Sequence, residues 1–517
     1  MESPEIQRIR GTNDVLAPLS TAYQELASRW RQQFGLYGYE LIDTPVLEPT
    51  DLFLRKSGEE VAARTYAFTH WNRDICLRPE FTASVIRAYV NHLQDRPLPV
   101  RLQYGGPTFR YEKPQRGRDR QFTEVGVECI GADGPAADAE VLAVARNGLE
   151  AVGLHNARYV VGHLGAVLQL LGQLGMEPRA QSLVLGVMEH LSRAPGETER
   201  VVERLAAMLG AGEEGEDGSR DGDPLGELVR SFGHDGAARI ASNLLERASL
   251  SLDGGVRSPE EIVERLLAKT SRTDPTPALA RAVEFIGQLR EAAGPPATAL
   301  PALRRVLAAH GLSDGPVHEV EQALAHFAAY SDEPAAVEVD LSLARGLRYY
   351  TGLVFEVYDV EGNQIAGGGR YDDLVRALGG RVSVPACGFS YGLERVIAAL
   401  RRNQIEPAAR QPASDVLVVP MESADYDLAA HAASALRTAG ISVEMDVRFR
   451  GLKANLRHAD HQLIPMVLIV GEREREAGLL GLRDMYARDE TRIPPAEIVP
   501  AVRARLDRVS MEAAGAR

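Results

Sequence analysis

The sequence predicts an α+β protein: an antiparallel sheet flanked by helices, a helical insertion that splits it, and a C-terminal α/β domain. Three observations predict this fold. Two strand-like stretches, 100–105 and 121–131, are joined by a charged loop, which is typical of an antiparallel hairpin with a long connection. A stretch rich in Ala, Leu and Glu follows. Residues 416–470 then alternate strand-like and helix-like segments.

Composition limits the class of protein. The chain has 517 residues, 45% of them hydrophobic and 25% charged, which excludes a disordered or fibrous chain. The net charge of −14 excludes a uniformly basic protein but leaves room for local basic patches. The cysteines Cys76, Cys129 and Cys387 lie far apart without a CxxC pair. We therefore expect free thiols in a reducing compartment, and neither a zinc knuckle nor a disulfide scaffold.

No segment has the pattern of a membrane helix or a secretory signal. Residues 1–8 lack an apolar core. The longest apolar runs, such as 466–470, have the length of a strand and not the roughly 18 residues of a membrane span. We expect a soluble, cytoplasmic protein without a membrane partner.

Four domain segments follow from the patterns. Residues 1–157 mix helix and strand, with a helix expected over 23–34, where apolar side chains recur at helical spacing. The helical insertion is expected over 158–334, and its acidic, low-complexity stretch 210–226 is expected to be a mobile surface loop.

Strand patterns return in residues 335–404. Strands are expected over 338–341 and 354–358, and a helix over 393–400. The glycine-rich segment 366–373 is interpreted as a flexible turn, because such segments are most often turns.

The last domain, 415–517, follows a Pro- and Ala-rich linker at 405–414. Its βαβαβ order predicts a small parallel α/β domain, and the absence of a GxGxxG motif gives a dinucleotide site little support. The expected elements are, in order, strand 416–419, helix 426–438, strand 442–445, helix 452–462 and strand 466–470.

Positive charge is concentrated in and before the loop that joins the first two strands. The six cations are Arg101, Arg110, Lys113, Arg116, Arg118 and Arg120. Cations this close repel one another unless an anion lies among them, and the planar guanidinium group suits a phosphate. The alternative is a solvated, charged loop.

The strand after this loop carries two carboxylates. Because side chains alternate along a strand, Glu124 and Glu128 share one face with Gly126 between them. Beside the arginines, they are placed to hold an ammonium group next to a phosphate. The alternative is an acidic strand edge that faces solvent. Glu80 and Thr82 follow an expected strand end and are weaker candidates on their own.

Two later elements also carry candidates. Arg345 precedes a glycine that permits close approach of a ligand, whereas Tyr349 and Tyr350 are interpreted first as packing residues. Arg395 falls in the first turn of a helix, where the helix dipole disfavours a cation that lacks an anionic partner. A structural ion pair explains Arg395 equally well.

The order and content of five elements resemble the histidyl-tRNA synthetase family, which belongs to the class II aminoacyl-tRNA synthetases. Phe109-Arg110 resembles class II motif 2, residues 392–395 resemble motif 3, and 345–350 resemble an element peculiar to the histidine enzymes. The opening 10–18 and the Arg78-Pro-Glu element complete the match. The resemblance covers the chain except for the insertion, which is enlarged.

The resemblance implies a class II catalytic domain with a mainly antiparallel, six-stranded sheet, and a C-terminal domain similar to the anticodon-binding domain. It implies that ATP and histidine form histidyl-adenylate, and that the histidyl group passes to tRNA(His). It also implies Mg²⁺ on the ATP phosphates, and a homodimer with class II motif 1 around residues 35–54.

The resemblance also implies a role for each matching residue. Arg345 would neutralise charge at the reacting α-phosphate, which Arg110 would bind, while Arg395 would bind the γ-phosphate. No residue is expected to ligate a metal directly. The remaining implied residues are Arg118 and Arg120 near the ATP phosphates, Glu80, Thr82, Glu124, Glu128, Tyr350 and Tyr371 around histidine, and Lys113 and Gln115 at the tRNA acceptor end.

Three positions depart from the family pattern: Glu124 stands where Gln is usual, Arg348 stands where Asp is usual, and the opening motif carries Ala17 before Pro18. The first two leave open a non-catalytic, histidine-binding relative, the regulatory subunit of ATP phosphoribosyltransferase. That subunit usually lacks a C-terminal domain and often the catalytic arginines, both of which are present here. A stand-alone RNA-binding module and a glycyl- or prolyl-tRNA synthetase explain fewer of the matching residues.

A local basic patch is expected in the last domain. It consists of Arg448, Arg450, Lys453, Arg457 and His458. Such a patch can contact RNA phosphates with a salt-dependent affinity. The alternative is a solvated helix face.

Overall fold

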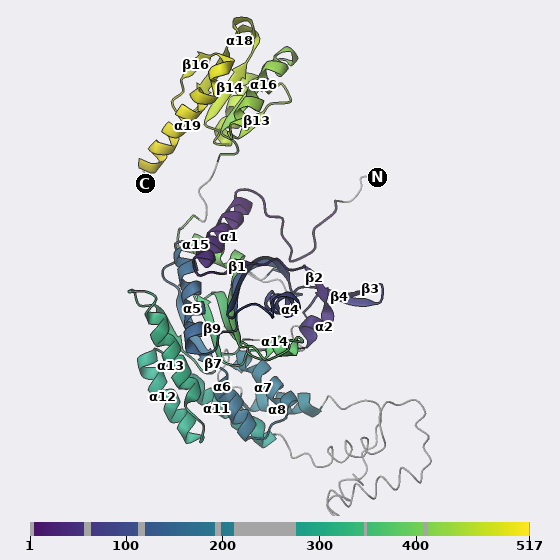
Figure 1. Ribbon diagram of the computed structural model, residues 1–517, viewed down its shortest axis with the longest axis vertical. Coiled ribbons are helices and arrows are strands. Elements are labelled where there is room, and N and C mark those ends of the chain that lie inside the picture. The colour runs from purple at the N-terminus through teal and green to yellow at the C-terminus, as the bar shows by residue number, and fades with distance from the viewer. Residues whose placement is uncertain are drawn as a thin grey trace, which may run out of the picture. The chain divides into compact units, whose positions relative to one another are not determined.

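The computed structural model describes residues 5–55, 64–111, 119–191, 198–210, 276–345, 349–406 and 412–515. The chain divides into two compact units, Met1–Pro407 and Ala408–Arg517 (Figure 1). Nearly all of the acidic stretch 210–226 lies outside the described residues.

An eight-stranded sheet forms the centre of the first unit. Its six inner strands run antiparallel, while the two edge strands β1 and β8 each join in parallel. The prediction of a mainly antiparallel sheet is confirmed, but the sheet has eight strands and not the six that were expected. The edge strand β1 has only two residues, which is too short to produce a pattern in the sequence. The order is β1 (Glu40–Leu41), β5 (Val100–Phe109), β6 (Gln121–Ile130), β11 (Ala386–Gly392), β10 (Gln364–Arg370), β9 (Leu353–Tyr358), β7 (Arg158–His163) and β8 (Ala336–Val339).

Two strands correct the predictions from sequence. β10 contains residues 366–370 of the glycine-rich segment 366–373. These residues are not a flexible turn, because β10 is paired with β11 on one side and β9 on the other. β7 occupies residues 158–163, where the helical insertion was expected to begin, and it pairs with both β9 and β8. Strands buried on both faces lose the alternation that reveals them in a sequence.

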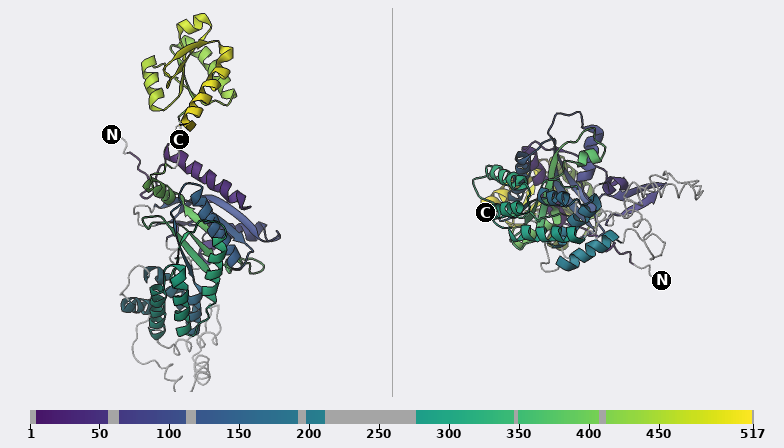
Figure 2. Two further views of the ribbon diagram at one scale, coloured as in Figure 1. Left: turned by 90° about the vertical axis from the view of Figure 1, so that its left-hand side faces the viewer. Right: turned by 90° about the horizontal axis from the view of Figure 1, so that it is seen from below.

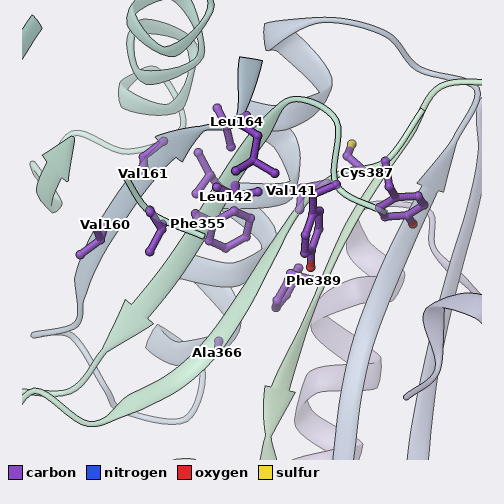
Figure 3. Close-up of a cluster of buried hydrophobic side chains, with 14 of the residues drawn as sticks. Val141, Leu142, Val160, Val161, Leu164, Phe355, Ala366, Cys387 and Phe389 are labelled. Carbon is purple, nitrogen blue, oxygen red and sulfur yellow. The ribbon is translucent and has the colours of Figure 1, made fainter. Parts of the chain in front are cut away.

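Helices cover one face of this sheet. α1 (Leu19–Leu36) buries Leu26, Trp30 and Phe34, whose helical spacing predicted the element. The Trp30 ring stacks on Tyr391 of β11, with their centroids 4.5 Å apart. α5 (Pro135–Glu150) and α15 (Leu393–Arg402) pack beside α1, and Figure 3 shows Val141 and Leu142 of α5 near Phe355 and Phe389 of the sheet.

The helices of the insertion gather at one end of the sheet, where Figures 1 and 2 colour them from blue to teal. Among the described residues, no helix is both long and apolar enough to span a bilayer. The helices are α6 (Gly165–Gln173), α7 (Pro178–Leu191), α8 (Thr198–Gly210), α11 (Thr276–Glu291), α12 (Pro296–Ala309) and α13 (Gly315–Ala328).

A three-stranded antiparallel sheet lies before the central hairpin in sequence. Its strand order is β2-β4-β3. Leu52 and Phe53 pack there with Cys76 and Ala83, and this small core fixes the start of α4. The elements are β2 (Leu47–Pro49), α2 (Thr50–Leu54), β3 (Ala67–His70), β4 (Arg73–Leu77), α4 (Thr82–His92) and, packed against α4, α14 (Leu374–Ala377).

The second unit has a five-stranded sheet of order β13-β12-β14-β15-β16. The first three strands are parallel, as predicted, and two antiparallel strands extend them beyond the expected βαβαβ unit. α16 and α19 pack on one face and α17 on the other. The elements are β12 (Val416–Pro420), a 3₁₀ turn (Ser423–Asp425), α16 (Tyr426–Thr438), β13 (Val443–Met445), α17 (Leu452–His461), β14 (Met466–Val470), α18 (Glu472–Ala477), β15 (Leu480–Asp484), β16 (Glu490–Ile493), a 3₁₀ turn (Pro495–Glu497) and α19 (Ile498–Gly515).

Candidate active site

One face of the central sheet is rich in glycine and forms the floor of the candidate site. It is opposite the face that α1 and α5 cover. The strand register places Gly126, Gly367, Gly369 and Gly388 on this face together with Glu124 and Glu128. A Cβ on Gly388 would lie 1.8 Å from Glu128 Oε2, and a Cβ on Gly367 would lie 1.2 Å from Arg345 Nη1. The glycines are therefore needed because polar side chains lie directly on the strands.

Glu128 is the centre of a cluster of acidic and hydroxyl side chains on this floor, which we call the acidic pocket. Its side chain is buried, so the alternative of a solvent-facing acidic edge is wrong. Its carboxylate accepts hydrogen bonds from Thr82 Oγ1 (2.7 Å), from the Tyr104 hydroxyl (3.1 Å) and from the Tyr371 hydroxyl. Burial raises the pKa of Glu128 to about 8, against the opposing effect of these hydrogen bonds.

Glu80 lies beside this pocket, just before α4. Its Oε1 accepts the backbone N–H of Ala83 at 3.0 Å, which ties the carboxylate to the first turn of the helix. Its Oε2 is buried and has no hydrogen-bond partner in the described structure. Burial raises the pKa of Glu80 to about 7. A buried oxygen without a partner is costly, and a cationic ligand would satisfy it.

Tyrosine rings wall the pocket. Tyr349, Tyr350 and Tyr371 contact one another, with ring centroids 4.9 Å, 5.6 Å and 6.5 Å apart. A Cβ on Gly369 would lie 3.0 Å from the Tyr350 ring, so this ring covers the floor. An acidic pocket with aromatic walls suits a small cation that carries a flat group.

Arginines form the other end of the site. Arg110 follows β5, and its Nη2 donates to Glu124 Oε1 at 3.1 Å while its Nε donates to the Pro79 carbonyl oxygen at 2.8 Å. Arg345 precedes β9 and donates from Nη1 to the Phe355 carbonyl oxygen at 2.8 Å, whereas its buried Nε has no partner in the described structure. The site therefore pairs an anion-binding end with a cation-binding end.

Arg395 lies on the same side of the sheet as Glu124. It is the third residue of α15, and a Cβ on Gly392, the register partner of Glu124, would lie 3.4 Å from its side chain. Its Nη1 is 3.3 Å from the carbonyl oxygen of Gln364 in β10. Arg120 lies at the mouth of the β5–β6 hairpin, where its guanidinium covers the Tyr111 ring at 4.1 Å.

The structure thus brings together Arg110, Arg345 and Glu124 at one end, and the residues around Glu128 at the other. Arg118, Lys113, Gln115 and Arg348 lie outside the described residues. Sequence reasoning missed Tyr104, although pairing the two predicted strands would have placed it opposite Gly126. It also interpreted Tyr349 as packing, and nothing local in the sequence distinguishes it from a core tyrosine.

Chemically, the site can bind one molecule that carries an ammonium group and a second that carries a phosphate. Glu124, near Arg110 and Arg345, and Glu128, among the tyrosines, lie on a single strand, so the two ligands would meet over its glycine. No nucleophile is required, because stabilising charge in a phosphoryl or acyl transfer needs fixed cations and positioning.

The basic patch of the second unit is only partly free of ion pairs. Arg450 is paired with Asp446 at 3.0 Å, and His458 with Glu444 at 2.7 Å. Arg448, Lys453 and Arg457 are exposed, and no ion pair is found for them among the described residues. These three cations lie on α17 and the loop before it.

Comparison with known proteins gives one family. The model of the histidyl-tRNA synthetase family matches residues 11–207 and 236–396, and that of the anticodon binding domain matches 415–505. The histidine–tRNA ligase of Pyrococcus furiosus is 31% identical over 498 residues, which are 96% of this chain and 98% of the relative. That of Methanocaldococcus jannaschii is 31% identical over 489 residues, 94% and 96% of the two chains.

Solved structures agree on the fold. Histidyl-tRNA synthetase from Nostoc superposes with a TM-score of 0.60 at 18% identity, over 97% of this chain and all of the other. The Staphylococcus aureus enzyme superposes with a TM-score of 0.57 at 22% identity, over 96% of this chain. The length of the family match and the relatives at 31% identity carry the assignment. The chain belongs to the histidyl-tRNA synthetase family.

Proposed function

We propose that this protein is a histidine–tRNA ligase, which activates histidine with ATP and transfers it to tRNA(His). The observation that carries the proposal is the two-ended site on β6, with a buried acidic pocket next to a pair of arginines. The curated relatives are named histidine–tRNA ligases. The enzyme class is therefore an aminoacyl-tRNA ligase with ATP as co-substrate.

In the proposed binding mode, the acidic pocket holds histidine. The unpartnered Oε2 of Glu80 accepts the ammonium group, and Glu128, held by Thr82, bonds the imidazole. Tyr350 and Tyr371 enclose the ring. A site that bonds both ring nitrogens rejects ligands of the same shape that lack them, because its buried polar groups would stay unpaired.

In the proposed reaction, the arginines act on the phosphates. Arg110 and Arg345 contact the α-phosphate while the histidine carboxylate attacks it, the bond to pyrophosphate breaks, and the new bond joins the carboxylate oxygen to phosphorus. Arg395 and Arg120, with Arg118 of the loop, bind the outer phosphates. The 3′-terminal ribose hydroxyl of tRNA then takes the histidyl group and AMP leaves, with Lys113 and Gln115 proposed at the acceptor stem.

We also propose that Mg²⁺ accompanies ATP and supplies charge neutralisation on its phosphates. Among the described residues, no group of three His, Cys, Asp or Glu side chains could hold a metal ion. Cytoplasmic location is a proposal that rests on the reaction, since its substrates belong to translation. The domain boundaries are also proposals. Because β7 belongs to the central sheet, we place the start of the insertion after β7.

A homodimer is proposed through residues 35–54. Four large apolar side chains within this stretch are exposed, Leu36 by 80%, Leu41 by 60%, Leu47 by 50% and Leu54 by 53%. Exposed large apolar side chains are often covered by a partner subunit, which supports this proposal. Light scattering at micromolar concentration should give twice the mass of the chain, and a monomer would refute the proposal.

The experiment that tests the function is histidine-dependent exchange of labelled pyrophosphate into ATP, without tRNA. Exchange above the level with other amino acids is expected, followed by charging of tRNA(His). Binding of histidine without exchange would instead favour the regulatory-subunit alternative, in which histidine is a signal and not a substrate.

A further inference from the structure

Glu124 has different surroundings from the other two carboxylates of the site. Its side chain is 9% exposed, and its Oε1 is bonded to Arg110 Nη2. Glu80 keeps a free oxygen in the acidic pocket, and Glu128 is surrounded by hydroxyl groups. Glu124 is therefore the carboxylate of the arginine end.

Several charged groups among the described residues act on Glu124. Arg110, Arg345 and Arg78 stabilise its ionised form, and the backbone N–H of Phe81 adds a hydrogen bond. Glu80 is the opposing anion. Burial raises the pKa of Glu124 above its usual value, and these cations offset only part of that rise. Three guanidinium groups around one buried carboxylate form an anion site that the protein fills with its own side chain.

Arg110 is held at two points by this arrangement. Its Nε is fixed by the Pro79 carbonyl and its Nη2 by Glu124, yet 30% of its side chain remains exposed. An incoming phosphate can reach the guanidinium, but it then lies close to the Glu124 carboxylate. Two anions on one arginine repel each other, so a phosphate must compete with Glu124.

We propose that Glu124 is an internal counter-ion, a positioning residue that holds Arg110 ready and gives it up to the nucleotide phosphate when ATP binds. The proposal rests on the proposed function, because it concerns the phosphate end of the same site. Glu124 fixes the arginine in the empty enzyme and weakens ATP binding, because the Arg110–Glu124 contact must be exchanged. Glu124 does not bind the ammonium group of histidine, since its Oε1 is already paired with Arg110.

The test compares E124Q with the parent protein by calorimetry. MgATP and histidine are titrated separately into the full-length protein. Gln has the shape of Glu and can still accept the Arg110 hydrogen bond, so only the charge is removed. We expect E124Q to bind MgATP about tenfold more tightly, the effect of removing one like charge near a phosphate, and histidine within about twofold of the parent. E124D keeps the charge and should bind MgATP no more tightly than the parent.

Three results would overturn the proposal. Unchanged or weaker MgATP binding by E124Q would show that the charge does not compete with phosphate. Weaker histidine binding with unchanged MgATP binding would make Glu124 an ammonium ligand. Equal gains in E124Q and E124D would point to a structural change and not to charge.

Steady-state exchange gives an independent readout. The KM for ATP should fall in E124Q while the KM for histidine stays close to that of the parent, a split that a general loss of structure would not produce. The experiments separate two kinds of failure. If the proposed function is wrong, the parent protein shows no histidine-dependent exchange. If only the role of Glu124 is wrong, the parent protein shows exchange, and E124Q binds MgATP as the parent does.

Discussion

At the scale of single residues, the site depends on charges that the protein holds out of water. Arg345 has a buried Nε without a partner in the described structure, and its guanidinium rests on Gly367. Glu80 has a buried oxygen in the same condition. Such groups are kept in place by packing and are satisfied when a ligand arrives, which is how a preorganised site stabilises a transition state.

Arg345→Ala should reduce histidine-dependent pyrophosphate exchange by about 10² to 10³-fold, because it removes a fixed positive charge from the reacting phosphate. The fold should survive, since among the described residues the side chain makes one hydrogen bond, to the Phe355 carbonyl. The measurement is the exchange rate together with a thermal melt. A folded variant with normal exchange would refute the role of Arg345.

Histidine binding should strengthen from pH 6.5 to pH 8. Burial raises the pKa of Glu80 to about 7 and that of Glu128 to about 8, so both lose protons in this window. The ammonium group of histidine favours ionised Glu80, and an imidazole N–H favours ionised Glu128, so binding releases protons. The same pKa values, raised above about 4.3 in the unfolded chain, mean that the unliganded protein loses stability as pH rises through 7 and 8.

The measurement for this prediction is calorimetry of histidine binding at several pH values, in buffers of different ionisation enthalpy. Proton release near pH 7 is expected, together with a lower melting temperature of the free protein at pH 8 than at pH 6.5. Binding that is independent of pH and of the buffer would show that both carboxylates are already ionised.

At the scale of elements, the site lies on the central strands because glycines there leave room for the side chains of the site. β10 supplies Gly367 and Gly369, over which Arg345 and Tyr350 lie. Gly126 of β6 lies under Tyr104, and Gly388 of β11 lies under Glu128. These strands are paired on both sides, so substitutions there act on the site and not on an exposed loop.

Gly367→Ala should abolish most exchange activity, about as far as Arg345→Ala, because its methyl group would occupy the place of the Arg345 Nη1. Gly287→Ala is the matched control. It lies in α11, where a Cβ meets nothing within 4 Å, and Ala favours a helix. Exchange rates and melting curves of both variants decide the matter, and an active Gly367→Ala protein would contradict the close packing of Arg345 on β10.

In the second unit, α17 is the element expected to contact tRNA. Arg457→Ala should weaken tRNA binding and reduce the slope of log affinity against log salt by about 1, because one phosphate contact is lost. Arg503→Ala is the control, since α19 lies on the opposite face of the sheet. Filter binding between low and moderate salt measures both slopes. Equal slopes in the two variants would remove α17 from the proposed interface.

At the scale of the whole molecule, the two compact units divide the proposed work. Every described residue of the candidate site lies within Met1–Pro407, and the exposed cations of α17 lie within Ala408–Arg517. Each unit has its own hydrophobic core. The chemistry of activation should therefore depend on the first unit alone.

A fragment of residues 1–407 should retain histidine-dependent exchange within about threefold of the full chain, because it keeps the complete site and core. Charging of tRNA(His) by the same fragment should fall by an order of magnitude or more, since the proposed tRNA contacts of the second unit are gone. Both assays on the fragment and the full chain measure this. A folded fragment without exchange would show that the second unit contributes to the site.

Local patterns along the chain predicted several elements closely. Helix 426–438 and strand 466–470 have the bounds that their apolar spacing predicted. The alternation of β6 correctly placed Glu124 and Glu128 on one face. β7 and β10 were missed, because strands that are covered on both faces, or are built of glycine, carry no alternating signal.

The sequence by itself determined the antiparallel hairpin, the α/β order of the last unit, and the family to which the motifs belong, because these depend on residues near one another in the chain. Only the tertiary structure decided what the carboxylates do. Glu128 is bonded by Tyr371, 243 residues away, and Glu124 is paired with Arg110 across the hairpin. Burial and pairing set the charge of a group, and both arise only when distant segments fold together.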